Sequence, residues 1–221
     1  VTDKADGERN LLYVSSIGHM YLIDTNMNFM FTGVVTQNKE LFDSLLDGEH
    51  IKYDKNNKFI NLYAAFDIYF INKKSVRELN FMPMNLDDVP EKFRLNLLNN
   101  FIKEMKPKSI LSKDSGNSNS VKMHGDANDS REHSCWLNIT CKQFHSSFEE
   151  NIFNGCSKIL TKAKDGLFEY NTDGLIFTPA STGVGGDRPN HAGPVKKFTW
   201  EKSFKWKPPE FNTIDFLVSI K

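Results

Sequence analysis

The sequence predicts an α+β fold built largely from antiparallel sheets. Short apolar segments rich in β-branched and aromatic residues follow one another through the first third of the chain, and polar turn residues separate them. Two later segments have the spacing of apolar side chains that is typical of helices, and strand-like segments return near the end. With 221 residues and 18 Phe, the chain is long enough to bury one substantial core. We therefore expect one domain, over residues 1–221.

The first predicted strands form an antiparallel meander. Gly18 and the Asn26-Met27-Asn28 segment connect the first three strands, and the polar residues 54–58 form the turn between the last two. The predicted strands are residues 11–15, 19–24, 29–35, 45–53 and 60–71.

A helix is predicted after this sheet. Asp87 or Asp88 is suited to cap it, Pro90 to occupy its first turn, and Pro107 to stop it. The apolar residues that recur every four positions are Phe93, Leu97, Phe101 and Met105. This spacing indicates a stripe that packs against the core.

The second half of the chain begins with a polar stretch. Residues 109–134 are rich in Ser, Asn, Asp and Lys, which predicts a solvated insertion without a catalytic role. A second helix is predicted from Phe148 to about Lys162, and strands return at residues 175–177, 204–206 and 213–220. The predicted apolar side of this helix consists of Phe148, Ile152, Cys156 and Ile159.

Composition and charge exclude several classes of protein. The formal net charge is zero, so the chain as a whole has no field that would attract nucleic acid, although a local basic groove is compatible with this balance. No apolar run approaches the roughly 20 residues that span a bilayer, and the start does not resemble a signal peptide. We expect a soluble intracellular protein without a membrane partner. Because the chain starts at Val1 and close to its first motif, we also expect it to be a segment of a longer polypeptide.

The three cysteines favour reduced thiols over a disulfide framework, because an odd number cannot pair completely within one chain. His133, Cys135, Cys141 and His145 offer a possible zinc set. However, the gap between the two cysteines does not match the closely spaced pairs that zinc sites use. Buried or exposed free thiols are the favoured interpretation.

Lys4 begins a K-x-D-G sequence that Arg9 follows, and a lysine in this pattern can bond covalently to a nucleotide. The lysine must first lose its proton, and neighbouring positive charge favours that loss. Lys205 and Lys207 could supply the charge, because alternation along a strand places both on one face with Trp206 opposite. They would also neutralise charge on an α-phosphate during its displacement. The further lysines of this basic wall are Lys196, Lys197 and Lys202.

The simpler interpretation of Lys205 and Lys207 is an exposed strand edge that lysines keep soluble. A glycine-rich loop at residues 181–187 is not a phosphate loop, because no Gly-Lys-Ser/Thr sequence follows it.

Carboxylates in two further sequences are candidate ligands of a hard divalent cation. Glu49 closes the Asp47-Gly48-Glu49 sequence, and Asp173 precedes Gly174. The alternative for the first sequence is an acidic turn or strand end.

Three nearby residues have both a functional and a structural interpretation. Arg9 could bond a ribose, fix the nucleophile loop through Asp6, or form a surface salt bridge. Phe66 could present its ring to a purine, but core packing is the commoner role of a phenylalanine. Asp67 beside it is compatible with a structural role.

Together, these residues resemble the covalent nucleotidyltransferase superfamily, which includes mRNA capping guanylyltransferases and ATP- or NAD-dependent polynucleotide ligases. The resemblance extends from Lys4 to about Phe216. It implies a nucleotide cleft between the sheets and a phosphoramidate on the lysine. The implied roles are the nucleophile for Lys4, ribose contact for Arg9 and base contact for Phe66. Glu49 would be the acidic residue of the superfamily's third sequence motif, Asp173 the acidic residue of its fourth motif, and Lys205 and Lys207 the lysines that contact the α-phosphate.

Two segments favour capping over ligation. Residues 172–179 resemble the form that the fourth sequence motif takes in capping enzymes. Residues 205–208 with 212–216 resemble the fifth motif of capping enzymes still more closely. The implied reaction transfers GMP from GTP, with Mg²⁺ or Mn²⁺, to the 5′-diphosphate end of RNA. An ATP-dependent RNA or DNA ligase, and a non-catalytic RNA- or protein-binding module, are the alternatives.

The composition and the polar insertion resemble the multifunctional capping enzymes of large DNA viruses. That resemblance implies triphosphatase and methyltransferase domains in the same chain, and a location in the virion or host cytoplasm. The OB-fold domain that usually follows in this superfamily is not recognised within the 221 residues.

Overall fold

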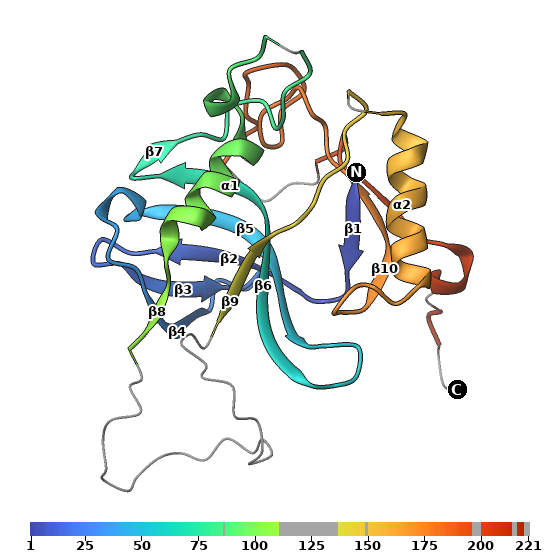
Figure 1. The fold of residues 1–221 in the computed structure, drawn as a ribbon, viewed down its shortest axis with the longest axis horizontal. Coiled ribbons are helices and arrows are strands. Elements are labelled where there is room, and N and C mark those ends of the chain that lie inside the picture. The colour runs from blue at the N-terminus through green and yellow to red at the C-terminus, as the bar shows by residue number, and fades with distance from the viewer. Residues whose placement is uncertain (86, 111–136, 149, 196–199, 214–215, 219–221) are drawn as a thin grey trace, which may run out of the picture.

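A computed structural model describes the chain except for residues 86, 111–136, 149, 196–199, 214–215 and 219–221. The described residues form two β-sheets, each covered by an α-helix (Figure 1). The strands are β1 (Thr2–Ala5), β2 (Glu8–Val14), β3 (His19–Ile23), β4 (Phe29–Val35), β5 (Ser44–Tyr53), β6 (Phe59–Ile71), β7 (Lys74–Ser75), β8 (Lys108–Ser109), β9 (Asn138–Cys141), β10 (Thr172–Phe177) and β11 (Phe204–Trp206). The α-helices are α1 (Arg94–Met105) and α2 (Ile152–Lys164), and the 3-10 helices are η1 (Lys39–Leu41), η2 (Pro90–Lys92) and η3 (Pro209–Phe211).

The larger sheet contains the predicted meander. Its strand order is β7-β6-β5-β2-β3-β4-β8 with antiparallel neighbours, and β9 adds to β6 in parallel. The Asp54 side chain accepts hydrogen bonds from the backbone N–H groups of Asn56 and Lys58, which closes the predicted turn between β5 and β6. The five strands predicted for this region are therefore confirmed, with boundaries that differ by at most three residues.

Helix α1 packs across one face of the larger sheet (Figure 1). Its buried residues include Leu98, Phe101 and Met105, which join a core with side chains of β2 to β6. Its end is as predicted, since Lys106 has left-handed backbone geometry directly before Pro107.

The predicted start of α1 is wrong. Pro90 belongs to η2, and the helix begins only at Arg94. The Asp88 side chain accepts hydrogen bonds from the backbone N–H groups of Met84 and Asn85, so it closes a preceding turn instead of capping the helix.

The smaller sheet has the order β1-β10-β11, and α2 covers it. Ile152, Cys156 and Ile159 of α2 pack there, as predicted. The helix starts four residues later than expected, because the Asn151 side chain caps it, and Phe148 lies outside it with an exposed side chain.

Two further sequence predictions fall partly outside the described residues. Most of the polar insertion at 109–134 is not described, although Ser109 lies in β8. In the predicted strand 213–220, the described residues Thr213 and 216–218 are not in a strand, and the others are not described. Within the described part of the chain, neither α-helix has the length and apolar character needed to cross a membrane.

A buried ion pair joins the larger sheet to α1 and to two loops. Both carboxylate oxygens of Asp67 accept hydrogen bonds from Arg94, at 2.8 and 3.1 Å, and the Arg94 side chain is completely buried. The remaining Arg94 nitrogen donates to the backbone carbonyls of Leu79 and Thr182. These contacts support the structural role suggested for Asp67.

We predict that Asp67→Ala lowers the free energy of unfolding by about 3–5 kcal/mol, because Arg94 would remain buried without its counter-ion. Urea denaturation of the purified protein measures this change. Lys73→Ala serves as the control, because Lys73 is exposed and its salt bridge with Asp43 should contribute about 1 kcal/mol or less. Similar losses in the two variants would contradict the assignment of Asp67–Arg94 as a buried structural pair.

Candidate functional site

Lys4 lies in β1, and its side chain contacts Asp173, one of the two predicted acidic residues. The Lys4 Nζ atom donates a hydrogen bond of 2.7 Å to Oδ1 of Asp173 in β10. Lys207, which directly follows β11, places its own Nζ 2.7 Å from Oδ2 of the same carboxylate. One carboxylate therefore bridges two lysines that are far apart in the sequence.

These ion pairs affect the protonation of Asp173. Burial alone would raise the pKa of this carboxyl group, but the hydrogen bonds from Lys207 and Lys4 outweigh that effect and hold the pKa below its ordinary value. Asp173 is therefore a carboxylate at neutral pH.

Gly174 brings the backbone of β11 close to Asp173. Its φ of +147° is unfavourable for residues with a side chain, and a Cβ atom at this position would lie 2.0 Å from the carbonyl oxygen of Trp206. In the Asp-Gly sequence, Asp173 supplies the bridging carboxylate, and Gly174 lets the backbone at Trp206 come close enough for Lys207 to reach that carboxylate.

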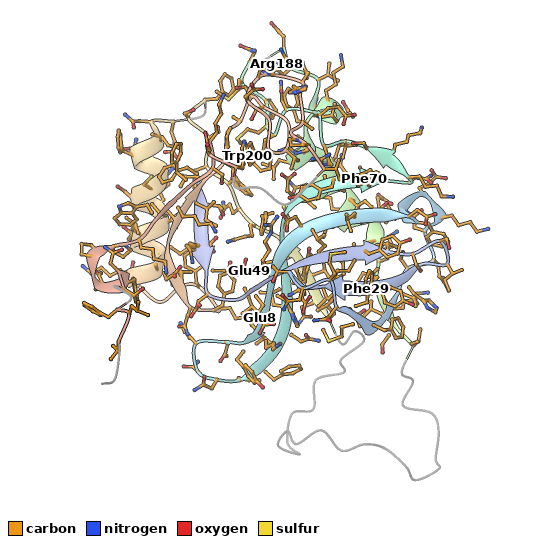
Figure 2. The ribbon with its side chains drawn as sticks, turned by 180° about the vertical axis from the view of Figure 1, so that it is seen from behind. Glu8, Phe29, Glu49, Phe70, Arg188 and Trp200 are labelled. Atoms are coloured by element: carbon orange, nitrogen blue, oxygen red, sulfur yellow. The ribbon has the colours of Figure 1, made fainter. Side chains whose placement is uncertain are left out.

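Glu49 lies in the middle of β5, so the interpretation of Asp47-Gly48-Glu49 as a tight turn is wrong. Glu49 is partly buried near the smaller sheet (Figure 2). Burial raises the pKa of its carboxyl group, and the positive charges of Lys142, Lys4 and Lys205 oppose that rise. Glu49 therefore lies within the electrostatic influence of Lys4.

Arg9 is bound to Asp47 of the neighbouring strand. Its Nε and Nη2 atoms lie 3.0 and 2.7 Å from the two oxygens of Asp47, and Tyr69 donates its hydroxyl to the same carboxylate. Arg9 therefore pairs with Asp47, and the suggested contact with Asp6 is not formed in the described structure.

Sequence reasoning missed a buried network on the other side of β1. The Lys142 side chain lies 3.0 Å from Oδ2 of Asp3 and donates to the Asp3 carbonyl at 2.5 Å, and Tyr170 donates to the same carboxylate at 3.2 Å. Asp3 precedes Lys4, so the network holds the strand that carries Lys4. Its only sequence signal was the position of Asp3 beside the motif, since Lys142 stands in no recognised pattern.

Among the described residues, no hydrogen bond or ion pair joins Phe66, Lys202 or Lys205 to Lys4, Asp173 or Lys207. Phe66 is half-buried in β6. Lys205 is exposed in β11, and its positive charge acts to lower the pKa of Glu49. Lys202 donates to the carbonyl of Asp187. Lys196 and Lys197 lie outside the described residues.

The glycine-rich loop at 181–187 does not present a phosphate cradle. The N–H groups of Val184 and Gly186 already donate to the carbonyls of Arg77 and Gly183, and no helix follows in the described part of the loop. These bonds agree with the rejection of a phosphate loop.

The suggested zinc set cannot be assembled from the described residues, because His133 and Cys135 lie outside them. Burial raises the pKa of the Cys141 thiol to about 12, which disfavours the thiolate that zinc requires. Among the described side chains, no three His, Cys, Asp or Glu residues cluster as a metal site.

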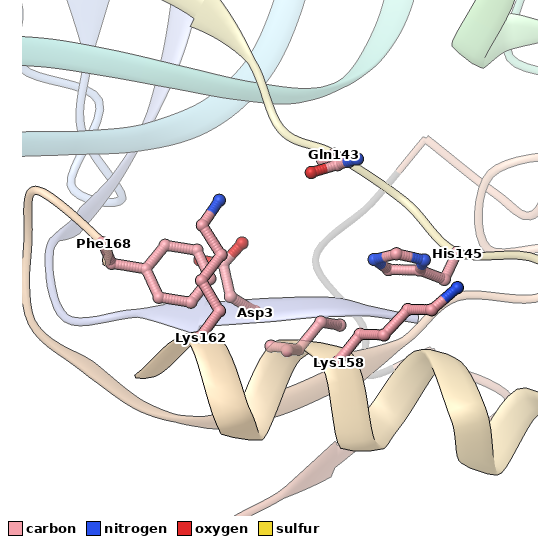
Figure 3. A pocket seen from close by; sticks show the side chains of 7 residues that line it. Asp3, Gln143, His145, Lys158, Lys162 and Phe168 are labelled. Carbon is pink, nitrogen blue, oxygen red and sulfur yellow. The ribbon is translucent and has the colours of Figure 1, made fainter. Parts of the chain in front are cut away.

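A hollow of about 170 Å³ lies between α2 and residues 143–145 (Figure 3). Asp3 lines it, and the alternation of side chains along β1 turns Lys4 away from it. Its basic side chains already have partners: Lys158 and His145 contact Glu150, and Lys162 lies over the ring of Phe168. The hollow is therefore separate from the cluster around Asp173.

Comparison with known proteins adds a family match to this geometry. Residues 1–209 match the family described as mRNA capping enzyme, catalytic domain. The whole chain aligns with a probable mRNA-capping enzyme of Acanthamoeba polyphaga mimivirus at 24% identity, and with the mRNA-capping enzyme subunit alpha of Schizosaccharomyces pombe at 27% identity. It spans 19% of the length of the first protein and 48% of the second.

We predict that Gly174→Ala loosens β11, because the added methyl group would collide with the Trp206 carbonyl. Hydrogen exchange should show faster exchange at residues 204–206. Gly33→Ala is the control, since Gly33 also has a positive φ, of 74°, but lies in β4 of the other sheet. Unchanged exchange in β11, or equal loosening of β11 by both variants, would contradict the proposed contact.

We also predict that Glu49→Gln stabilises the protein at neutral pH. A carboxyl group whose pKa is raised by folding contributes its full stability below the unfolded pKa of about 4.3, and loses it as pH rises through the native pKa. The advantage of the variant in unfolding free energy should therefore grow as pH increases from about 4. Denaturation at several pH values measures it, and a difference that does not change with pH would contradict the raised pKa.

Proposed function

The chain belongs to the mRNA capping enzyme catalytic-domain family, and from this we propose that it is the guanylyltransferase domain that transfers GMP from GTP to RNA. The observation that carries the proposal is the joining of Lys4 on β1, Asp173 on β10 and Lys207, which directly follows β11. A nucleophile, a carboxylate and a phosphate-binding cation are the groups that this transfer needs.

In the first step, the Nζ atom of Lys4 attacks the α-phosphorus of GTP. A P–N bond forms, the bond between the α-phosphorus and the bridging oxygen breaks, and pyrophosphate leaves with that electron pair. The Nζ atom must give up a proton before or during this attack, because an ammonium group has no free electron pair. In the described state, Asp173 holds the group by an ion pair, so the nucleotide complex must weaken that pair.

The other residues bind and orient the nucleotide. Lys207 and Lys205 neutralise charge on the α-phosphate, and Arg9 directs its guanidinium group to the ribose. Phe66 offers its half-buried ring to the guanine base. These assignments follow the family resemblance.

Asp173 and Glu49 have the chemistry to hold Mg²⁺ or Mn²⁺. Both supply carboxylate oxygens, and Mg²⁺ is commonly bound by one or two carboxylates together with substrate phosphates. When bound, the cation would neutralise phosphate charge during transfer. At Asp173 it would compete with the ammonium groups that occupy both oxygens.

In the second step, a terminal oxygen of a 5′-diphosphate RNA attacks the phosphorus on Lys4. A P–O bond replaces the P–N bond, which yields a 5′-5′ triphosphate cap and returns the lysine. Triphosphatase and methyltransferase domains in the same polypeptide would supply the diphosphate end and modify the cap, and they are part of the proposal.

We predict that incubation with α-labelled GTP and Mg²⁺ leaves a label on the protein that survives denaturation and is released by acid. Lys4→Ala should abolish it, because the nucleophile is lost. Gel electrophoresis of the denatured protein, with α-labelled ATP in parallel, measures the label.

The matched control is Lys52→Ala, since Lys52 is also a strand lysine paired with a carboxylate, that of Glu8. This variant should retain the label. Labelling by ATP alone would favour a ligase, and absence of label with either nucleotide would favour a non-catalytic binding module.

A further inference from the structure

We propose that Asp47 and Tyr69 are positioning residues that set the guanidinium of Arg9 for recognition of the ribose hydroxyl groups. The inference rests on the proposed function and extends it to two residues that the motifs did not assign. Its basis is a hydrogen-bonded unit on three adjacent strands: Arg9 on β2, Asp47 on β5 and Tyr69 on β6.

The carboxylate of Asp47 holds the Arg9 guanidinium in one orientation. Its side chain is 1% exposed, and its two oxygens receive the Nε and Nη2 atoms of Arg9 in the bidentate arrangement that fixes both the position and the plane of a guanidinium. Tyr69 donates its hydroxyl to Oδ2, the oxygen that also receives Nη2. The carboxylate is thereby held from two sides.

The Arg9 side chain is not enclosed by this pairing. It is 58% exposed, and its Nη1 atom donates to no other group within the described part of the chain. A buried carboxylate thus anchors the Nε–Nη2 edge of the guanidinium, Nη2 also donates to the Tyr69 hydroxyl at 3.4 Å, and Nη1 is left available. The two N–H donors of Nη1, held in a fixed plane, suit the oxygen atoms of a sugar.

A second Asp–Arg pair in the same sheet shows what a structural pair looks like. Asp67 is directly opposite Asp47 in the β5–β6 register, and it also makes two bonds to an arginine. That arginine, Arg94, is fully buried, and its free nitrogen donates to two backbone carbonyls. The Arg9 pair lacks both features, which points to a ligand outside the protein.

The protonation states agree with these roles. The hydrogen bond and charge of Asp47 raise the pKa of Arg9, so the guanidinium remains a donor. Burial, followed by the charge of Asp47, raises the pKa of Tyr69 well above its ordinary value, so its hydroxyl keeps the proton that it donates.

The experiment compares GTP with 2′-deoxy-GTP and 3′-deoxy-GTP as donors of the covalent label. We expect the wild type to prefer GTP over at least one deoxy analogue by about tenfold to hundredfold, the range expected for a hydrogen bond from a charged donor. Arg9→Ala should abolish this preference. Asp47→Asn should abolish most of it, and Tyr69→Phe should reduce it several-fold.

Two controls separate positioning from a general loss of structure. Asp67→Asn weakens the structural pair and should lower stability without changing the preference between GTP and the deoxy analogues. The double variant Arg9→Ala with Asp47→Asn should label no more slowly than Arg9→Ala alone, because Asp47 acts through Arg9. Tyr69→Phe removes one hydroxyl and remains informative if Asp47→Asn does not fold.

The inference is overturned if the wild-type preference persists in both Asp47→Asn and Tyr69→Phe. It is also overturned if the losses of labelling rate from Arg9→Ala and Asp47→Asn add in the double variant. If the wild type forms no label with GTP, the proposed transfer fails, and calorimetric titration with the same three nucleotides tests the inference separately. In that titration, equal affinities for GTP and both analogues overturn it, whereas a preference lost in Asp47→Asn supports it.

Discussion

The carboxylate of Asp173 ties Lys4 and Lys207 to the middle strand of the smaller sheet, and the proposed transfer depends on these two contacts. It lies on the central strand, β10, and binds Lys4 of β1 and Lys207 directly after β11, so a single side chain connects the start of the chain with the segment that follows β11. Gly174 makes this possible, because only a residue without a Cβ atom lets the backbone at Trp206 approach so closely. The sequence pair Asp-Gly therefore has two separate physical functions at adjacent positions.

The larger sheet contributes a different kind of order. Two aspartates opposite each other on β5 and β6 each bind an arginine, but one arginine is enclosed and the other is exposed. The enclosed pair connects the sheet to α1 and to the loops at Leu79 and Thr182. The exposed pair fixes a donor at the surface without using all of its hydrogen bonds. Similar chemistry thus supports the fold in one place and leaves an exposed guanidinium in another.

The spacing of apolar residues along the sequence was sufficient to predict most strands and the core face of α2. Strand alternation and helical spacing depend only on residues that are close in the sequence. It also placed Glu49 and Lys205 on strands, but it did not predict β1, the strand that carries Lys4. It could not show that Asp173 bridges Lys4 and Lys207, or that Arg9 pairs with Asp47, because those contacts depend on the register between strands.

The errors at helix starts have an equally local cause. Asp88 has the side chain of a cap but forms hydrogen bonds to Met84 and Asn85, and competition between such turns cannot be read from residue type alone. Lys142 was missed for the opposite reason, since its environment is created entirely by the fold, which places it against Asp3.

The ion pair at Lys4 has a consequence for unwanted chemistry. A primary amine with a free electron pair reacts with aldehydes, acyl donors and other electrophiles that a cell contains. Paired with the Asp173 carboxylate, and with only 19% of its side chain exposed, the Lys4 amine is poorly accessible to them. In the proposed transfer, nucleotide binding would weaken this contact, so Asp173 would cover the lysine amine until the nucleotide arrives.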